Sequence, residues 1–225
     1  MARGKTLWEM LMEKLSSPVE FKFYNPLHAR IGHSVMIDEV ELREFNFFLR
    51  EIREYKRHIE GKEFLFADYV LLARPLNHDD VWVRLRLNPV DESERAGGLS
   101  HHVLMLKLYD EMAYDEGLHQ VLNDTTKRFQ VIEEGQVKEE YLRINDVSSP
   151  YKAVVAVIRD INQDNKVEMS EVERARLEYW DYWRETTDET GQKVTEYLFV
   201  EMDTSNGWFQ MWKGTEIDPQ RVMVI

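Results

Sequence analysis

Apolar and polar residues alternate along most of this chain, from Phe21 to the C-terminus. A period of two sends successive side chains to opposite faces, which is typical of β-strands. Residues 81–87 (VWVRLRL), 195–202 and 208–212 are clear examples. The apolar, β-branched run at 153–158 (AVVAVI) predicts a strand at the centre of a sheet. The alternation therefore predicts a molecule dominated by antiparallel sheet.

Three segments depart from this alternation. Residues 5–15 place Leu7, Trp8 and further apolar residues at helical spacing, and their pattern predicts a short N-terminal helix. We expect this helix to pack on the body of the protein, with peripheral contact to a membrane surface as the alternative. Residues 115–124 predict a second short helix, and residues 172–184 fit helix and strand equally well.

These patterns predict an α+β fold that is predominantly antiparallel β, built from meanders, with a short N-terminal helix. Apolar residues make up 43% of the chain and aromatic residues 12%, which is enough to build a packed core. Residues 88–100 combine proline, paired glycines and charge, as linkers do. We therefore predict an N-terminal helix in 1–20, a β-rich lobe in 21–90 and a second β-rich lobe in 101–225, with a single domain as the alternative.

The two halves of the chain echo each other. Each half runs through an aromatic strand, a glycine, a tyrosine-led apolar strand and a tryptophan after a turn. The matching elements are Gly61, 69–72 and Trp82 in the first half and Gly191, 197–200 and Trp208 in the second. A duplicated meander explains this echo, and so does coincidence, because three-stranded meanders are common.

Three short motifs carry a family resemblance. They are 31–38 (IGHSVMID), 66–71 (FADYVL), and 196–199 (EYLF) followed by Gly207 and Trp208. Together they resemble a bacterial β-rich family of unknown function, whose members carry an Ile-Gly start, a Tyr-x-Leu strand and a Gly-Trp turn. The motifs cover a minority of the chain, and the resemblance implies a β-rich fold without assigning an active site.

Charge and composition exclude several classes of function. The chain carries 29 basic and 42 acidic residues, and its formal net charge of −13 repels phosphate backbones, so we expect no nucleic-acid partner. Arg84 and Arg86 alternate with leucines, which predicts one solvent-facing side of a strand. The absence of cysteine excludes disulfides and cysteine-bound metals. No apolar run approaches the ~20 residues needed to span a bilayer, and we expect a cytoplasmic protein.

The segment 160–171 (DINQDNKVEMSE) resembles a calcium-binding loop. Asp160, Asn162, Asp164 and Glu171 place oxygen atoms at positions 1, 3, 5 and 12 of the twelve-residue pattern. Asn165 stands where the pattern has glycine, and the preceding residues read as a strand rather than a helix. A simple hairpin turn explains the same residues. We therefore expect no cofactor, with calcium bound by this loop as the alternative.

A dense aromatic cluster gives a second candidate site. If residues 180–183 form a strand, aromatic side chains occupy both faces, and one set can be exposed. Exposed Trp180, Tyr182 and Trp183 would mark a surface for a protein partner or a homo-oligomer. Packing between layers of the core is the alternative.

Catalytic chemistry has little support in the sequence. No Gly-x-Ser-x-Gly, Walker or Gly-x-Gly-x-x-Gly motif occurs, and no catalytic residue is predicted. The adjacent His101 and His102 would point to opposite faces of a strand, so they cannot hold one metal together there. The leading hypothesis is a non-enzymatic cytoplasmic accessory or protein-interaction protein. The alternatives are a calcium-binding module and a metal-dependent hydrolase whose ligands are scattered histidines and carboxylates.

Overall fold

Strands dominate the structure of this chain. The computed structural model describes residues 20–21, 24–59, 62–76, 79–90, 101–144, 150–159, 167–168, 173–188 and 190–225. Within these residues there is no helix with the length and apolar character needed to cross a lipid bilayer.

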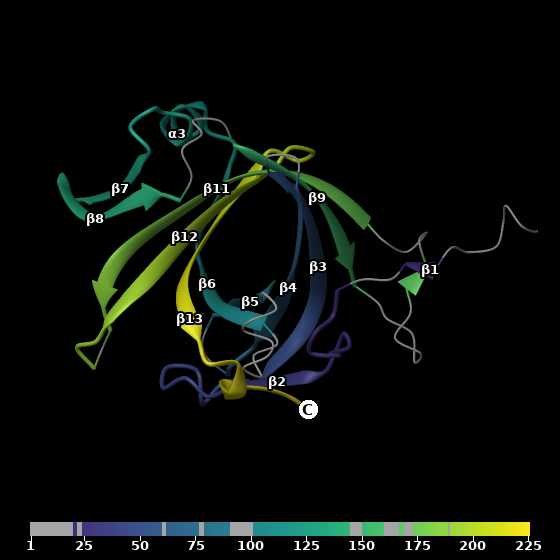
Figure 1. Cartoon of the computed structure of the whole chain (residues 1–225). Helices are drawn as coiled ribbons and strands as arrows, with labels where there is room; N and C mark the ends of the chain where they lie inside the picture. Colours follow the sequence, from purple (N-terminus) through teal and green to yellow (C-terminus); the bar gives the residue numbers. More distant parts are fainter. Residues whose placement is uncertain are drawn as a thin grey trace, which may run out of the picture.

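Eight antiparallel strands close into a barrel (Figure 1). In order around the barrel they are β3 (Phe47–Ile59), β4 (Lys62–Ala73), β5 (Val81–Pro89), β6 (His101–Ala113), β13 (Trp208–Ile217), β12 (Lys193–Asp203), β11 (Glu173–Thr187) and β9 (Tyr151–Ile158). The ring closes because β9 pairs with both β11 and β3. The run at 153–158 is therefore a barrel strand with a neighbour on each side, as its apolar sequence predicts.

The barrel combines two meanders, and this corrects the predicted fold. Strands β3 to β6 form one meander, and β9 with β11 to β13 forms the other. The two meanders join where β6 pairs with β13 and where β9 pairs with β3. The predominance of antiparallel sheet is confirmed, but the expectation of an α+β fold built from separate meanders is wrong, since strands from both halves of the chain share one closed sheet. A separate meander would leave unpaired edge strands, and closure removes those edges.

Helix placement also differs from the expectation. The predicted helix at residues 5–15 lies outside the described residues. The α-helix that the described residues contain is α3 (Glu116–Leu122), which confirms the helix expected within 115–124. The side chain of Asp115 caps it by accepting a hydrogen bond from the Leu118 amide at 2.6 Å.

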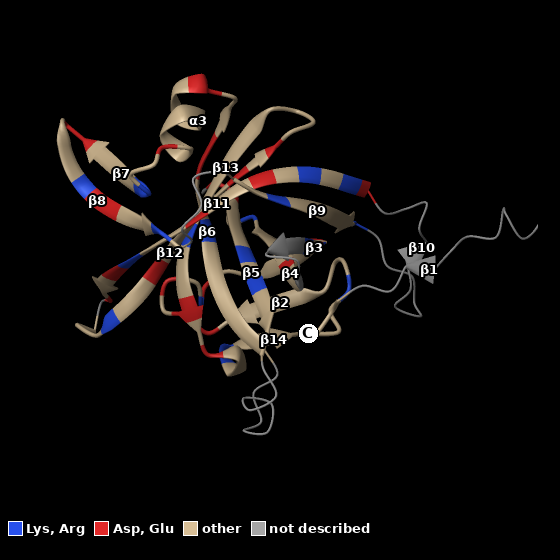
Figure 2. Ribbon diagram, turned by 45° about the horizontal axis from the view of Figure 1, so that its top comes forward, with Lys and Arg blue, Asp and Glu red and all other residues tan. Residues whose placement is uncertain are grey.

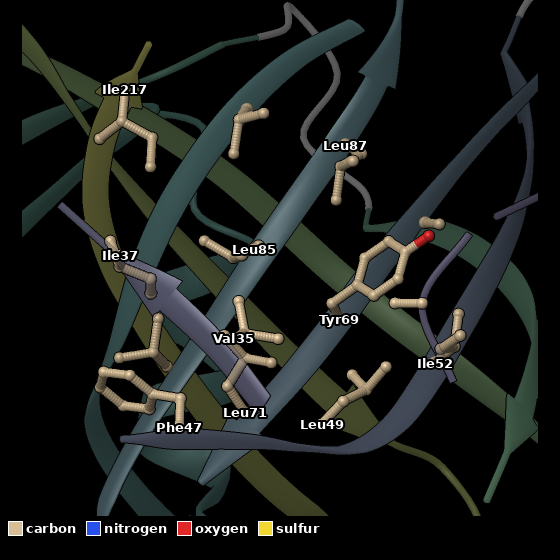
Figure 3. Packing of buried hydrophobic residues seen from close by; sticks show 14 of the residues in the cluster. Val35, Ile37, Phe47, Leu49, Ile52, Tyr69, Leu71, Leu85, Leu87 and Ile217 are labelled. Atoms are coloured by element: carbon tan, nitrogen blue, oxygen red, sulfur yellow. The ribbon is translucent and has the colours of Figure 1, made fainter. Parts of the chain in front are cut away.

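One cover lies on the outer face of the first meander. It consists of β2 (Ser34–Ile37), β14 (Val222–Val224) and the loops around them. Figure 3 shows Val35 and Ile37 of β2 lying together with Leu71 and Leu85 of the barrel. The outward side chains of β4 and β5 are therefore buried, although they face away from the barrel interior.

A second cover lies on the outer face of β11, β12 and β13. It consists of α3 and the hairpin of β7 (Arg128–Glu133) and β8 (Gln136–Arg143), and Leu122 and Phe129 from it pack with Trp180 and Phe209 of the barrel. The ambiguous residues 172–184 fall almost entirely in β11, so the strand interpretation of them is right. A further pair, β1 (Glu20–Phe21) and β10 (Val167–Glu168), lies apart from the barrel sheet.

Candidate functional site

Charged side chains fill the middle of the barrel interior. Glu201 of β12 contacts Arg84 of β5 at 2.7 Å and Arg86 of β5 at 2.9 Å. Because β6 and β13 separate these two strands in the sheet, side chains can meet at such distances only across the interior. Alternate positions on β5 therefore point inward. Figure 2 shows blue segments, which mark lysine and arginine, along this strand.

Four charged residues and one tyrosine form what we call the ionic cluster: Asp68, Arg84, Arg86, Glu201 and Tyr55. Arg86 binds Asp68 through two parallel bonds of 2.9 Å, from Nε to Oδ1 and from Nη2 to Oδ2. Arg84 Nη1 lies 3.2 Å from Asp68 Oδ2, and the Tyr55 hydroxyl donates to Glu201 at 3.3 Å. All five side chains are buried. Two arginines face two carboxylates, so the charges balance.

Aromatic rings surround both arginines. The guanidinium carbon of Arg86 lies 4.4 Å from the ring centre of Phe199, 4.7 Å from that of Phe66 and 5.3 Å from that of Tyr55. Arg84 stacks on Trp212 at 4.0 Å, and its Nε and Nη2 have no hydrogen-bond partner among the described residues. Cation–π contacts of this kind stabilise a desolvated guanidinium. The rings and carboxylates together hold Arg86 in a fixed position.

The ionic cluster sets the charge state of its acids. Burial alone would raise the pKa of Glu201, but Arg84, Arg86 and Arg53 outweigh burial and lower this pKa to about 2. Burial alone would likewise lower the pKa of Arg86, and Asp68 and Glu201 instead hold it well above its ordinary value. Glu201 is therefore an anion and Arg86 a cation at neutral pH.

This pKa predicts acid-sensitive stability. The pKa of Glu201 is about 2 in the folded protein against an ordinary value of 4.5, so its contribution to stability is complete above pH 4.5 and is lost as the pH falls towards 2. We expect the urea midpoint of unfolding to fall over this range, and to fall less steeply in Glu201→Gln. Glu51 and Glu139 also have lowered pKa values and leave a residual dependence in that variant. Equal acid sensitivity of the two proteins would contradict this assignment.

A cavity of about 360 Å³ opens beside Arg86, at the end of the barrel where β5 leads to β6. We call it the aromatic mouth. Its walls are Phe66, Leu104, Ile144, Tyr197 and Phe199, its floor is Arg86, and its polar groups are Asn88, His102, Asp181 and Glu216. The rings of Tyr197 and Phe199 are parallel within 7°, with centres 5.9 Å apart. The mouth is therefore an aromatic recess above a fixed guanidinium.

The opposite end of the barrel holds a second cavity, of about 270 Å³. Glu201 faces this second cavity, whereas Arg86 faces the aromatic mouth. Since Glu201 and Arg86 are bonded to each other, the ionic cluster lies between the two cavities. The interior is therefore closed in the middle and accessible from its ends.

A larger cavity, of about 850 Å³, lies outside the barrel between residues 38–43 and strands β6 and β13. Its charged groups pair with one another: Arg43 with Asp38, Lys107 with Glu41, and Arg221 with Glu39. Most of these side chains are exposed to solvent. We therefore place the candidate site in the aromatic mouth, where buried rings and a fixed charge coincide.

The residues of the predicted calcium loop, Asp160, Asn162, Asp164 and Glu171, all lie outside the described residues. Calcium binding by them stays a prediction. Across the part of the chain that the structure does describe, no group of three or more histidine or carboxylate side chains is arranged to hold a metal ion.

The predicted aromatic surface is divided between two faces of β11. Trp180 and Tyr182 are buried in the layer beneath α3, where the Trp180 indole donates to Asn123 at 3.1 Å. Trp183 takes the alternate face and is half-buried. The structure does not bring the three residues onto one exposed surface, and layer packing, the alternative to exposure, accounts for Trp180 and Tyr182.

Sequence reasoning missed the ionic cluster. Arg84 and Arg86 were expected on a solvent-facing side of β5, but they are 0% and 4% exposed. The available signal was the presence of acids, Asp68 and Glu201, at alternate positions within two other apolar strands. His102 does reach the mouth, where its Nδ1 lies 2.7 Å from Glu216, while His101 is buried on the other face.

Comparison of the chain with protein-family models, curated proteins and solved structures gave no match. The family resemblance noted in the sequence stays a prediction. The function therefore has to be inferred from the geometry of the barrel itself.

Proposed function

We propose that this protein is a non-enzymatic binding protein that holds a small aromatic ligand in the aromatic mouth. The observation that carries the proposal is the cavity of about 360 Å³ whose walls are aromatic and whose floor is the fixed guanidinium of Arg86. Barrels of eight strands have an interior just wide enough to be filled by side chains or to hold one small ligand. Barrel mouths are also a preferred location for small-molecule sites.

The size and walls of the mouth favour a compact, planar ligand. Small-molecule pockets span roughly 300–1,000 Å³, so this cavity lies at the lower end of that range. The parallel rings of Tyr197 and Phe199, with Phe66 nearby, offer flat surfaces on which a ligand ring can pack. A fused two-ring compound such as an indole has the appropriate size and shape.

The ionic cluster favours binding over catalysis. Its carboxylates are engaged by Arg84 and Arg86, and the pKa of Glu201 lies far below neutrality, whereas an acid–base catalyst works best with a pKa near the working pH. A guanidinium held by two carboxylates and three rings serves instead as a rigid floor. Rigidity of this kind lowers the entropic cost of ordering a site around its ligand.

Titration with tryptophol, a neutral indole alcohol, tests this proposal. We expect saturable binding by calorimetry. Leu104→Trp, which fills the mouth, should weaken binding more than about tenfold, and Phe199→Leu, which removes one ring, by about 2- to 10-fold. Ile132→Trp provides the matched control, because Ile132 is an exposed residue of β7 outside the mouth. The affinity of this variant for tryptophol should equal that of the unmodified protein.

Two results would refute the proposal. One is the absence of binding at millimolar concentration by tryptophol and by other small indoles. The other is equal affinity in the unmodified protein and in folded Leu104→Trp and Phe199→Leu. Circular dichroism establishes that each variant is folded, and Phe199→Leu keeps the test valid if the larger tryptophan at position 104 disrupts the barrel.

A further inference from the structure

We propose that the ligand of the aromatic mouth is an organic cation, specifically an aromatic amine. This inference rests on the proposed function and concerns the charge of the ligand. The two rim acids, Asp181 of β11 and Glu216 of β13, carry it, together with the bonding of Arg86.

The floor of the mouth does not favour an anionic ligand. Nε and Nη2 of Arg86 already donate to Asp68, and Nη2 also donates to Glu201. The side-on pair of donors with which arginine binds a carboxylate or phosphate is therefore occupied by protein acids. The positive charge of Arg86 is offset in the same way by the carboxylates of the ionic cluster.

The rim presents two carboxylates to a ligand. Asp181 is 5% exposed and Glu216 is largely exposed, and both line the cavity. Among the described residues, two groups oppose them. His102 contacts Glu216 at 2.7 Å, and Arg143 interacts electrostatically with Asp181 while donating to the Leu122 carbonyl in the outer layer at 2.9 Å. Arg86 is already balanced by the ionic cluster, and Arg143 is held in the outer layer. The carboxylates of Asp181 and Glu216, with the His102 imidazole between the strands, are therefore the charged and titratable groups that the described part of the mouth presents to a ligand.

The walls also suit a cation. The faces of aromatic rings carry negative electrostatic potential and attract ammonium and guanidinium groups. Phe66 and Phe199 already accept the guanidinium of Arg86 at 4.7 Å and 4.4 Å. Burial raises the pKa of Tyr197, and Glu216 raises it further, so this residue keeps its neutral hydroxyl beside an incoming amine.

Three indoles of matched shape test the inference. They are tryptamine, which is a cation at neutral pH, the neutral tryptophol, and the anionic indole-3-propionate. We expect tryptamine to bind about tenfold more tightly than tryptophol at low salt, and indole-3-propionate to bind least tightly. Raising the ionic strength should reduce the preference for tryptamine without weakening tryptophol, since salt screens exposed charges such as Glu216.

Substitutions of the two rim acids show which residues produce the preference for tryptamine over tryptophol. Asp181→Asn and Glu216→Gln should each reduce the preference for tryptamine, and the double variant should abolish it, with tryptophol affinity unchanged. Glu140→Gln, a substitution on the hairpin strand β8 outside the mouth, is the control and should retain the full preference. If Asp181→Asn fails to fold, the exposed Glu216→Gln still decides the outcome.

The outcomes separate the two proposals. Equal affinity for all three indoles, or an unchanged preference in folded Glu216→Gln and Asp181→Asn, would overturn the cation inference while leaving the proposed function intact. Failure of every indole to bind would refute the proposed function itself.

Discussion

Glu201→Gln will lower the free energy of unfolding by roughly 3–5 kcal/mol. The substitution keeps the size of the side chain and removes the charge that Arg84 and Arg86 share at 2.7 Å and 2.9 Å. Two buried guanidinium groups would then share Asp68 as their acid within the ionic cluster. Removing one partner of a buried ion pair is costly because an uncompensated charge remains away from water. Urea unfolding at pH 7 measures the loss.

Two further variants show whether the lost charge balance causes the loss of stability in Glu201→Gln. Glu140→Gln removes an acid of the exposed pair with Arg128, whose side chains are 37% and 57% exposed, and should cost under about 1 kcal/mol. The double variant Glu201→Gln with Arg84→Met restores balance and should recover part of the stability lost in the single variant. A loss below 1 kcal/mol in Glu201→Gln would contradict the buried ionic cluster.

Gly214→Ala will destabilise the protein by at least about 3 kcal/mol or prevent folding. A Cβ at position 214 would lie 1.8 Å from the Met105 carbonyl oxygen and 2.8 Å from its carbon. Both atoms belong to the backbone of β6, so no side-chain movement can relieve the overlap. Strands β6 and β13 would have to separate where they join the two meanders. Thermal unfolding followed by circular dichroism gives the measurement.

Gly135→Ala is the comparison for this prediction. Gly135 lies in the turn between β7 and β8 with φ of +76°, and an added Cβ there meets no atom within 4 Å. Gly135→Ala should lower the free energy of unfolding by about 1 kcal/mol, from backbone strain alone. If the two alanine variants are equally stable, the close approach of β13 to β6 is not a feature of the folded protein.

The strands could be predicted from the sequence because alternation is a local property. Residues 81–87 and 153–158 show their strands directly, and Asp115 marks the start of α3. The closure of the barrel could not be predicted in this way. Which edge of one meander pairs with which edge of the other depends on contacts between residues far apart in the chain, such as those of β9 with β3.

The charged interior was missed for a related reason. On a single open sheet, Arg84 and Arg86 alternating with leucines indicate one wet face and one buried face. In this closed barrel, whose outer face is itself covered by other segments, both faces of β5 are buried, and its polar residues Arg84 and Arg86 lie inside. Only the tertiary arrangement of Asp68 and Glu201 reveals that these arginines have partners.

The location of a bound indole tests the central claim of a ligand site in the aromatic mouth. We predict intermolecular nuclear Overhauser effects between the ring protons of tryptophol and the Leu104 methyl groups, with further effects to the ring of Phe199. Both residues line the mouth. Effects confined to Tyr109, in the outer cavity, would contradict the claim, as would a saturated complex in which Leu104 shows no contact with the ligand.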